Sequence, residues 1–291
     1  MKKKYKNILL LVILLCFLTL NMLSIDTIVL KIWEYTELFI KRIFPVSFIF
    51  ITLSNLLIEY NFIQLLQRIF RIKSPYIYIF ILSLISGFPA GAIYIKEMIE
   101  KEYISTEDAN RMIMFCHFPN PLFVINSVGS ILNSKTLSIY ILISIITSNF
   151  AIMLFSINKK KCSYIPFNNT DSFSNSLSKT IINSIKTIIL IYGISLFFFL
   201  ISVVINCLFH NTFIYIFING LFDLTYGVYS MSLLNNNFIK GLIILIIISI
   251  GPFSIHFQTK SILANTSVNY KNYLFGRFIG CIISILIFIH L

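Results

Sequence analysis

Long runs of apolar residues, separated by short polar segments, dominate this chain. Four runs have the roughly 18 or more residues that an α-helix needs to cross a hydrocarbon core of about 30 Å: Ile8–Ile25, Leu137–Ile157, Thr187–Phe209 and Tyr273–Ile289. Five more runs are shorter or interrupted: Phe44–Ile58, Tyr76–Ile95, Arg111–Leu132, Phe213–Tyr229 and Leu242–Gln258. The pattern predicts an all-α polytopic membrane protein that has the lipid bilayer as its main partner.

Composition supports the same class. The chain is 57% hydrophobic and 12% charged, whereas soluble domains carry about 25% charged residues. The net charge of +12 does not indicate a nucleic-acid partner, because the basic residues lie beside apolar runs rather than in a basic domain with interleaved aromatics. Four lysines near the start of the chain place the N-terminus in the cytoplasm by the positive-inside rule: Lys2, Lys3, Lys4 and Lys6. We expect a multi-pass protein of the cell membrane.

The first apolar run can be interpreted as a signal peptide or as a retained helix. Asn21-Met22-Leu23-Ser24 offers no small-x-small cleavage site, and the run is long. We therefore expect residues 1–26 to form an N-terminal transmembrane helix.

A polar stretch, Asn158–Lys179, divides the remaining apolar residues into two parts. We expect a first repeat at 27–157, a cytoplasmic linker at 158–172 and a second repeat at 173–291. Each part opens with a segment whose polar and apolar residues alternate at helical spacing, Thr27–Ile43 and Phe173–Lys186. We expect these two segments to lie in the membrane interface.

Each part also contains two Gly/Pro interruptions in matching register. The interruptions are Ser86–Gly91 and Cys116–Pro121 in the first part, and Gly220–Asp223 and Gly251–His256 in the second. Gly87 and Pro119 are 32 positions apart, as are Gly220 and Pro252. The register fails upstream of these breaks, so the repeat is partial.

Positive charge favours an inverted arrangement of the two parts. If Tyr76–Ile95 and Phe213–Tyr229 are re-entrant hairpins and the other runs cross, 18 of the 23 Lys and Arg residues lie inside. If both hairpins span instead, the Lys159–Lys186 cluster lies outside. The sequence therefore predicts inverted repeats with broken helices and re-entrant hairpins, and seven crossings in total.

Broken helices indicate where a binding site lies. Unpaired backbone groups are costly in lipid, so helix breaks are tolerated where protein or a watery cavity covers them, and the freed helix ends can bind polar solutes. A simple kink is the alternative for any single break, but four breaks in paired register favour a site. The candidate substrate-binding residues at these breaks are Gly87, Pro89, Gly91, His117, Asn120, Asn126, Gly220, Asp223, Tyr226, Ser254, His256 and Gln258.

Asp223 is the strongest single candidate, because a carboxylate inside a membrane segment usually faces a cavity, a partner or an ion path. The alternative is that Asp223 caps a short helix at a shallow position. His117 and His256 are too few to define a metal site, and the five dispersed cysteines have no ligand spacing, so no metal or cofactor is expected. The acidic and basic residues around Tyr103–Ser105 predict a solvated connector, with Ser105 or Thr106 as the helix N-cap.

An enzyme is not indicated, because the chain carries no Walker loop, G-x-S-x-G, H-E-x-x-H or paired-carboxylate motif.

Seven segments carry a resemblance to a known family: Ser86–Ala92, Ile104–Arg111, Phe115–Cys116, Pro119–Ile125, Val128–Gly129, Gly220–Gly227 and Gly251–Gln258. They resemble the YlbJ-type sporulation integral membrane proteins. These proteins group with the nucleoside-recognition or Gate domains of spore maturation proteins, nucleoside transporters and the ferrous-iron transporter membrane domain. The resemblance covers about Phe44 to Leu291. Membership would imply a role in endospore formation and a scaffold for solute transport.

The leading hypothesis is a sporulation membrane protein that acts as a transporter or permease for an unknown small polar solute, bound between the paired breaks. One alternative is a non-transporting scaffold for assembly of the spore envelope or cortex, and another is an intramembrane enzyme acting on a lipid-linked precursor. A homo-oligomer is left open.

Overall fold

The computed structural model describes residues 19, 25–60, 74–157, 172–207, 209 and 211–291, and these residues contain helices but no β-strand. Most of the N-terminal helix predicted at 1–26, and all of the linker predicted at 158–172 except residue 172, lie outside the described residues. In the first part the helices are α2 (Ile25–Leu38), η1 (Phe39–Ile43), α3 (Phe44–Glu59), α5 (Pro75–Ser86), α6 (Ala90–Glu100), α7 (Thr106–Met112), η2 (Phe123–Val128), α8 (Gly129–Ile131) and α9 (Lys135–Ser156).

In the second part the helices are α10 (Phe173–Asn206), α11 (Thr212–Phe222), α12 (Leu224–Ser230), η3 (Met231–Leu233), α13 (Asn237–Ile250), α14 (Phe253–Ile262) and α15 (Tyr270–His290). Among the described residues, five helices are long and apolar enough to cross a membrane: Ile25–Glu59, Lys135–Ser156, Phe173–Asn206, Asn237–Ile262 and Tyr270–His290. The predicted class of all-α polytopic membrane protein is confirmed.

The two segments expected to lie in the membrane interface are continuous with the apolar helices that follow them. Thr27–Ile43 continues through η1 into α3, and Phe173–Lys186 forms the first turns of α10. No Gly or Pro occurs between Phe173 and Tyr192, so no helix-breaking residue ends the helix near Lys186. Pro45 lies just after the π-helical turn η1, and such a turn can absorb the hydrogen bond that a proline removes.

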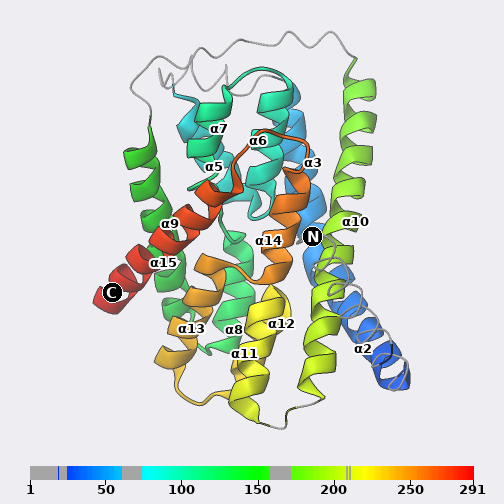
Figure 1. The fold of residues 1–291 in the computed structure, drawn as a ribbon, viewed down its shortest axis with the longest axis vertical. Helices are drawn as coiled ribbons and strands as arrows, with labels where there is room; N and C mark the ends of the chain where they lie inside the picture. The colour runs from blue at the N-terminus through cyan, green and yellow to red at the C-terminus, as the bar shows by residue number, and fades with distance from the viewer. Residues whose placement is uncertain (1–18, 20–24, 61–73, 158–171, 208, 210) are drawn as a thin grey trace, which may run out of the picture.

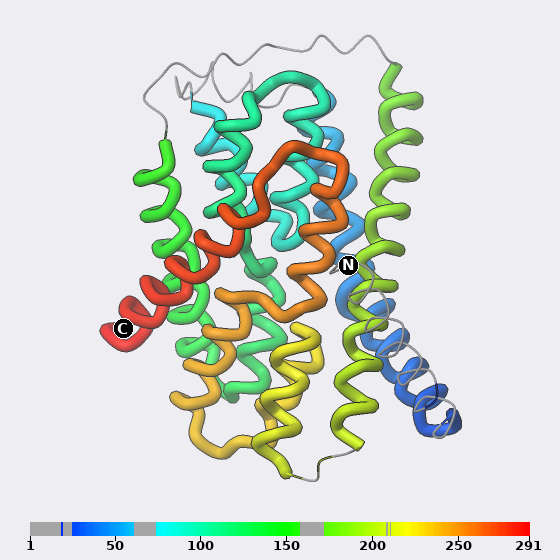
Figure 2. The backbone as a smooth tube through the Cα atoms, viewed as in Figure 1, coloured from blue at the N-terminus to red at the C-terminus, as the bar shows by residue number. Residues whose placement is uncertain are grey.

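The corresponding elements of the two parts run in opposite directions through the molecule. Figure 1 shows α2 and α3 rising toward the upper end, whereas α10 descends; α9 rises, whereas α15 descends. The α5–α6 hairpin enters from the upper end and turns back near mid-height, whereas the α11–α12 hairpin enters from the lower end (Figure 2).

The helix breaks follow from particular residues. Gly87 and Gly251 adopt φ values of 76° and 87°, which only glycine takes up without strain, and they end α5 and α13. Pro89 and Pro252 follow at the N-caps of α6 and α14. The predicted cap of α7 is confirmed, because the Ser105 hydroxyl accepts a hydrogen bond from the Asp108 amide over 3.1 Å.

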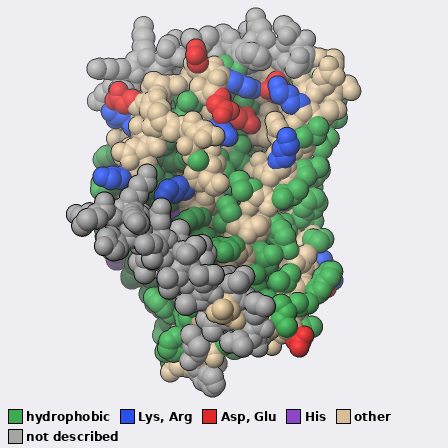
Figure 3. Space-filling model, turned by 45° about the vertical axis from the view of Figure 1, so that its right-hand side comes forward, with side chains coloured by type: hydrophobic (Ala, Val, Ile, Leu, Met, Phe, Trp, Pro, Cys, Tyr) green, Lys and Arg blue, Asp and Glu red, His purple; other side chains and the backbone are tan. Residues whose placement is uncertain are grey.

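Charged side chains are unevenly distributed over the surface. In the view of Figure 3 the Lys, Arg, Asp and Glu side chains gather mainly toward the upper end, and hydrophobic side chains cover much of the right-hand half at mid-height. Large apolar side chains such as Phe155, Phe213, Phe217 and Phe278 are exposed. Such a belt of apolar surface is expected where helices face lipid.

Candidate functional site

The four helix breaks form one contiguous cluster near the centre of the molecule. We call them the first tip (Gly87–Pro89), the long break (Ile113–Asn120), the short break (Gly251–Pro252) and the second tip (Asp223). The first tip packs against the long break so closely that a Cβ on residue 87 would lie 2.6 Å from the Asn120 amide nitrogen. The first tip and the long break are therefore in direct contact.

The long break also meets the short break. A Cβ on residue 251 would lie 3.4 Å from His117 Cε1 and 3.7 Å from His256 Nε2, so both histidine rings face Gly251. The short break in turn meets the second tip, because the Phe222 and Phe253 rings pack with centroids 5.5 Å apart. Residues from both parts of the chain therefore share one site.

His117 is buried and satisfies a free end of α13. Its Nε2 lies 3.2 Å from the Ile248 carbonyl oxygen, one of the last carbonyls of that helix, which have no partner within it. Because a carbonyl only accepts, Nε2 carries the proton, and the Tyr273 hydroxyl donates to Nδ1 over 2.7 Å. The Phe88 ring stacks on the imidazole at 4.8 Å between centroids.

His256 is half-buried on α14 and pairs with Tyr270. The Tyr270 hydroxyl donates to the His256 carbonyl oxygen over 3.2 Å, so His256 Nδ1 is the donor in its 2.7 Å contact with that hydroxyl. Its ring lies edge-on to Tyr273, with centroids 5.5 Å apart. Each histidine is therefore held by a tyrosine of α15.

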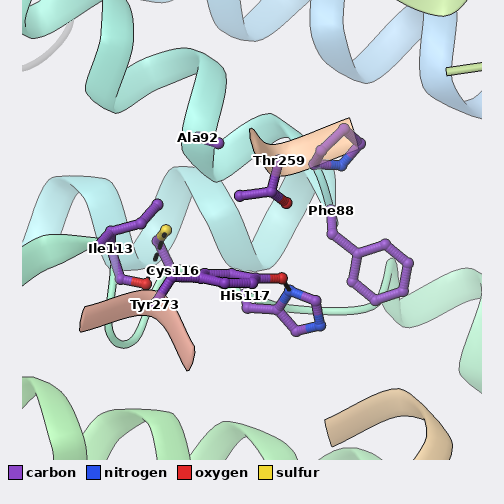
Figure 4. A pocket seen from close by; sticks show the side chains of 8 residues that line it. Phe88, Ala92, Ile113, Cys116, His117, Thr259 and Tyr273 are labelled. Carbon is purple, nitrogen blue, oxygen red and sulfur yellow. Dashed lines mark hydrogen bonds between the residues drawn. The ribbon is translucent and has the colours of Figure 1, made fainter. Parts of the chain in front are cut away.

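A small pocket lies between the first tip, the long break, α14 and α15. Figure 4 shows His117 and Tyr273 joined by their hydrogen bond on one side of it, with Thr259 and Phe88 nearby. The complete lining consists of Phe88, Pro89, Ala92, Ile113, Cys116, His117, Thr259 and Tyr273. Its free volume is about 10 Å³, which is close to the space one water molecule needs. This pocket therefore has room for about one water molecule.

Asp223 is both a helix cap and a deeply buried carboxylate. It is 1% exposed. Its Oδ1 accepts from the Tyr226 amide over 2.9 Å and caps α12, while Oδ2 accepts from the Tyr35 hydroxyl over 3.1 Å. Since α11 has 11 residues, Asp223 lies about 16 Å from the start of that helix. The capping alternative is therefore correct in its chemistry, and the carboxylate is also buried inside the protein.

Gln258 is buried one turn beyond Ser254 and joins α14 to α10. Its Nε2 donates to the Ser195 hydroxyl over 2.8 Å, and its Oε1 has no hydrogen-bond partner among the described residues. Ser254 is fully buried at the start of α14. Both side chains therefore lie on the inner face of α14.

The remaining predicted residues differ in their positions. Gly91 and Gly220 allow close packing, the first against the Cys116 carbonyl oxygen and the second against Ile247. Asn120 caps the next helix, since its Oδ1 accepts from the Leu122 amide over 2.9 Å. Asn126 is exposed on η2 and makes no contact with the cluster that the structure records, so the structure does not bring it to the site.

Arg277 is a central residue that the sequence did not single out. It is buried on α15 and donates to the Met114 carbonyl over 2.7 Å and to Asn149 Oδ1 over 3.0 Å. Asn149 Nδ2 donates to the His117 carbonyl over 3.2 Å, so the two side chains satisfy carbonyls that the long break frees. Within the described ranges, no carboxylate lies within 4 Å of the guanidinium. A cation inside an apolar run was the available signal.

Tyr35, Tyr273 and Ser195 are the other contributors that sequence reasoning missed. Each lies in a run whose pattern gives no reason to prefer one hydroxyl over another. Their partners are between 63 and 188 positions away in the chain.

Comparison with known proteins gives a weak similarity over most of the chain. The chain is 23% identical over 288 residues to the sporulation integral membrane protein YlbJ of Bacillus subtilis (strain 168), and the match covers 81% of this chain and 70% of that protein. No family model matches the chain, and no solved structure matches it. The chain is thus similar to a sporulation integral membrane protein and is itself an integral membrane protein with several apolar helices.

Proposed function

We propose that this chain is a sporulation membrane protein that binds a small polar solute at the cluster of helix breaks and moves it across the membrane. The observation that carries the proposal is the contact between breaks from both parts of the chain, through His117 and Gly251 and through Phe222 and Phe253. Polar side chains and freed helix ends gathered at mid-depth are the features from which transporters build solute sites. Chemistry on the solute is not part of the proposal.

The opposite directions of corresponding elements support an inverted-repeat organisation of the Gate type. In this organisation the α5–α6 and α11–α12 hairpins are re-entrant, the N-terminus is cytoplasmic and the upper end in Figure 1 faces the cytoplasm. Lys96, Lys101, Arg111, Lys260 and Lys271 belong to the segments that the topology assigns to that side.

Transport requires the cluster to open, because its pocket holds about one water molecule. We take the two hairpins as the moving elements, since each turns back at its tip rather than crossing the molecule. We therefore assign solute entry and release to displacement of the first or the second tip.

Comparison of small metabolites in spores with and without the protein tests this function. A transporter predicts that at least one small polar metabolite changes in abundance, and that the wild-type gene restores it whereas an Asp223→Asn gene does not. Unchanged metabolites together with a defective spore envelope would support the scaffold alternative instead.

A further inference from the structure

The α11 helix has two contrasting faces. Phe213, Phe217 and Leu221 follow one another at intervals of four residues and are exposed on the outside of the molecule. The opposite face carries four polar side chains at intervals of three or four residues, and we call this set the α11 stripe: Thr212, Tyr215, Asn219 and Asp223. Since residues three and four apart lie on one helix face, the stripe runs the length of the helix.

The lower end of the stripe opens into a hollow of about 370 Å³ at the surface. It is lined by Phe209, Asn211, Thr212, Tyr215 and Leu233. Two of these, Thr212 and Tyr215, belong to the stripe. Polar side chains therefore continue from open space into the interior.

Asn219 lies one turn above Tyr215 and is 1% exposed. The Asn206 amide, at the end of α10, donates to Asn219 Oδ1 over 2.9 Å. Asn219 Nδ2 and Asn206 Oδ1 have no hydrogen-bond partner within the described part of the chain. Buried polar atoms are rarely left without a hydrogen bond in folded proteins. These two atoms lie between the surface hollow and the Asp223 carboxylate, so they indicate a place for water or a polar ligand.

Asp223 ends the stripe. Its two carboxylate oxygens accept from the Tyr226 amide and the Tyr35 hydroxyl, which are neutral donors. No Lys or Arg of the described segments pairs with it within 4 Å. The negative charge at the inner end of the stripe is thus not compensated by a cationic side chain.

From this geometry we propose that the α11 stripe is an entry path by which a small hydrated cation reaches Asp223 from the lower face of the molecule. The path uses Asn206 and Asn219 as its narrow point. The proposal rests on the proposed function in one respect: it takes Asp223 as part of the solute site, where it binds the cation.

Thiol labelling of the full-length protein in lipid nanodiscs tests the path without knowledge of the solute. Asn219→Cys is made in a Cys207→Ser background, because Cys207 is exposed at the end of α10. The probe is a small impermeant thiosulfonate reagent in a cationic and an anionic form. Phe217→Cys is the matched control, because it lies two residues away on the same helix and faces outward.

A path predicts that Asn219→Cys reacts on the order of tenfold faster than Phe217→Cys, although Phe217 is the more exposed position in the structure. The cationic reagent should be favoured over the anionic one on the order of tenfold relative to Asn235→Cys in the exposed lower loop, and Asp223→Asn should remove this preference. A Thr212→Trp substitution at the hollow should slow the labelling.

An unreactive Asn219→Cys would overturn the proposal, as would labelling that shows no preference for the cation. If Asn219→Cys fails to fold, Asn206→Cys reports on the same narrow point from α10. The readout is separate from sporulation, so charge-selective labelling with a fully active Asp223→Asn would refute the proposed function while retaining the path.

Discussion

The Tyr35 hydroxyl donates to Asp223 Oδ2 over 3.1 Å, although the two residues are 188 positions apart in the chain. This bond ties the first long helix to the second tip. Tyr35 is fully buried and its ring stacks on Phe199 at 4.6 Å between centroids, so the hydroxyl has little freedom to leave the carboxylate. The position of Asp223 thus depends on both parts of the chain.

Tyr35→Phe should destabilise the protein, because it removes a donor from a buried carboxylate. Hydrogen bonds to charged groups contribute about 1.5–3 kcal/mol, and neutral ones about 0.5–1.5 kcal/mol. Tyr192→Phe is the matched control, since it removes the 2.7 Å contact between the Tyr192 and Thr36 hydroxyls. Thermal unfolding in detergent should show a larger loss for Tyr35→Phe. An equal or smaller loss would mean that the bond to Asp223 adds little.

Gly87→Ala should abolish function, because the new Cβ would lie 2.6 Å from the Asn120 amide nitrogen and the φ of 76° is strained for alanine. Gly193→Ala is the control on α10, where a Cβ meets no atom within 4 Å. We expect Gly193→Ala to sporulate normally and to be slightly stabilised, by up to about 1 kcal/mol, through higher helix propensity. Membrane abundance and spore counts measure both variants. Normal sporulation of Gly87→Ala would show that the first tip tolerates displacement.

Arg277→Met should be strongly destabilising, because it leaves the Met114 carbonyl and Asn149 Oδ1 without their donor at the long break. Each buried group left unsatisfied costs about 1–3 kcal/mol. Arg111→Met removes only an exposed pair with Glu107, for which the expected loss is below about 1 kcal/mol. Unfolding midpoints of the two variants should differ accordingly. Similar midpoints would argue against Arg277 as a support of the long break.

Topology can be read from two exposed loop positions, Asn235 and Asn265. The distribution of Lys and Arg places the loop containing Asn265 inside and that containing Asn235 outside. In intact cells an impermeant thiol reagent should therefore label Asn235→Cys and leave Asn265→Cys unlabelled until the membrane is permeabilised. Both changes are made in a Cys207→Ser background, because Cys207 is itself exposed. The opposite pattern would invert the assignment of the two faces.

The positions of the helix breaks could be predicted from the sequence, because Gly and Pro act locally. Gly87, Gly251 and Pro252 interrupt helices where the pattern indicated, and Asp223 lies at the predicted turn between two short helices. The sequence pattern divided α10 between Phe173–Lys186 and an apolar run that begins at Thr187, and this division was wrong. Polar residues such as Lys179 and Lys186 expose one face of a helix to water, but they do not end the helix.

The partners of the predicted residues could not be derived from pattern alone. Tyr273, Arg277 and Ser195 reach the site through contacts between distant helices, and helical periodicity does not distinguish them from neighbouring polar residues. Asn126 was predicted at the site because it lies close in sequence to the long break. It is exposed, because the helical turn of η2 directs it outward.

The central claim is that the cluster of breaks around Asp223 performs the function, and complementation of a deletion strain tests it most directly. Asp223→Asn is compared with Glu100→Gln, whose carboxylate is exposed at the end of α6 beside Lys96. After correction for membrane abundance, we predict that Asp223→Asn restores far fewer spores than Glu100→Gln, which should match the wild type. Equal restoration by the two variants would contradict the claim, because Asp223 would then act only as the cap of α12.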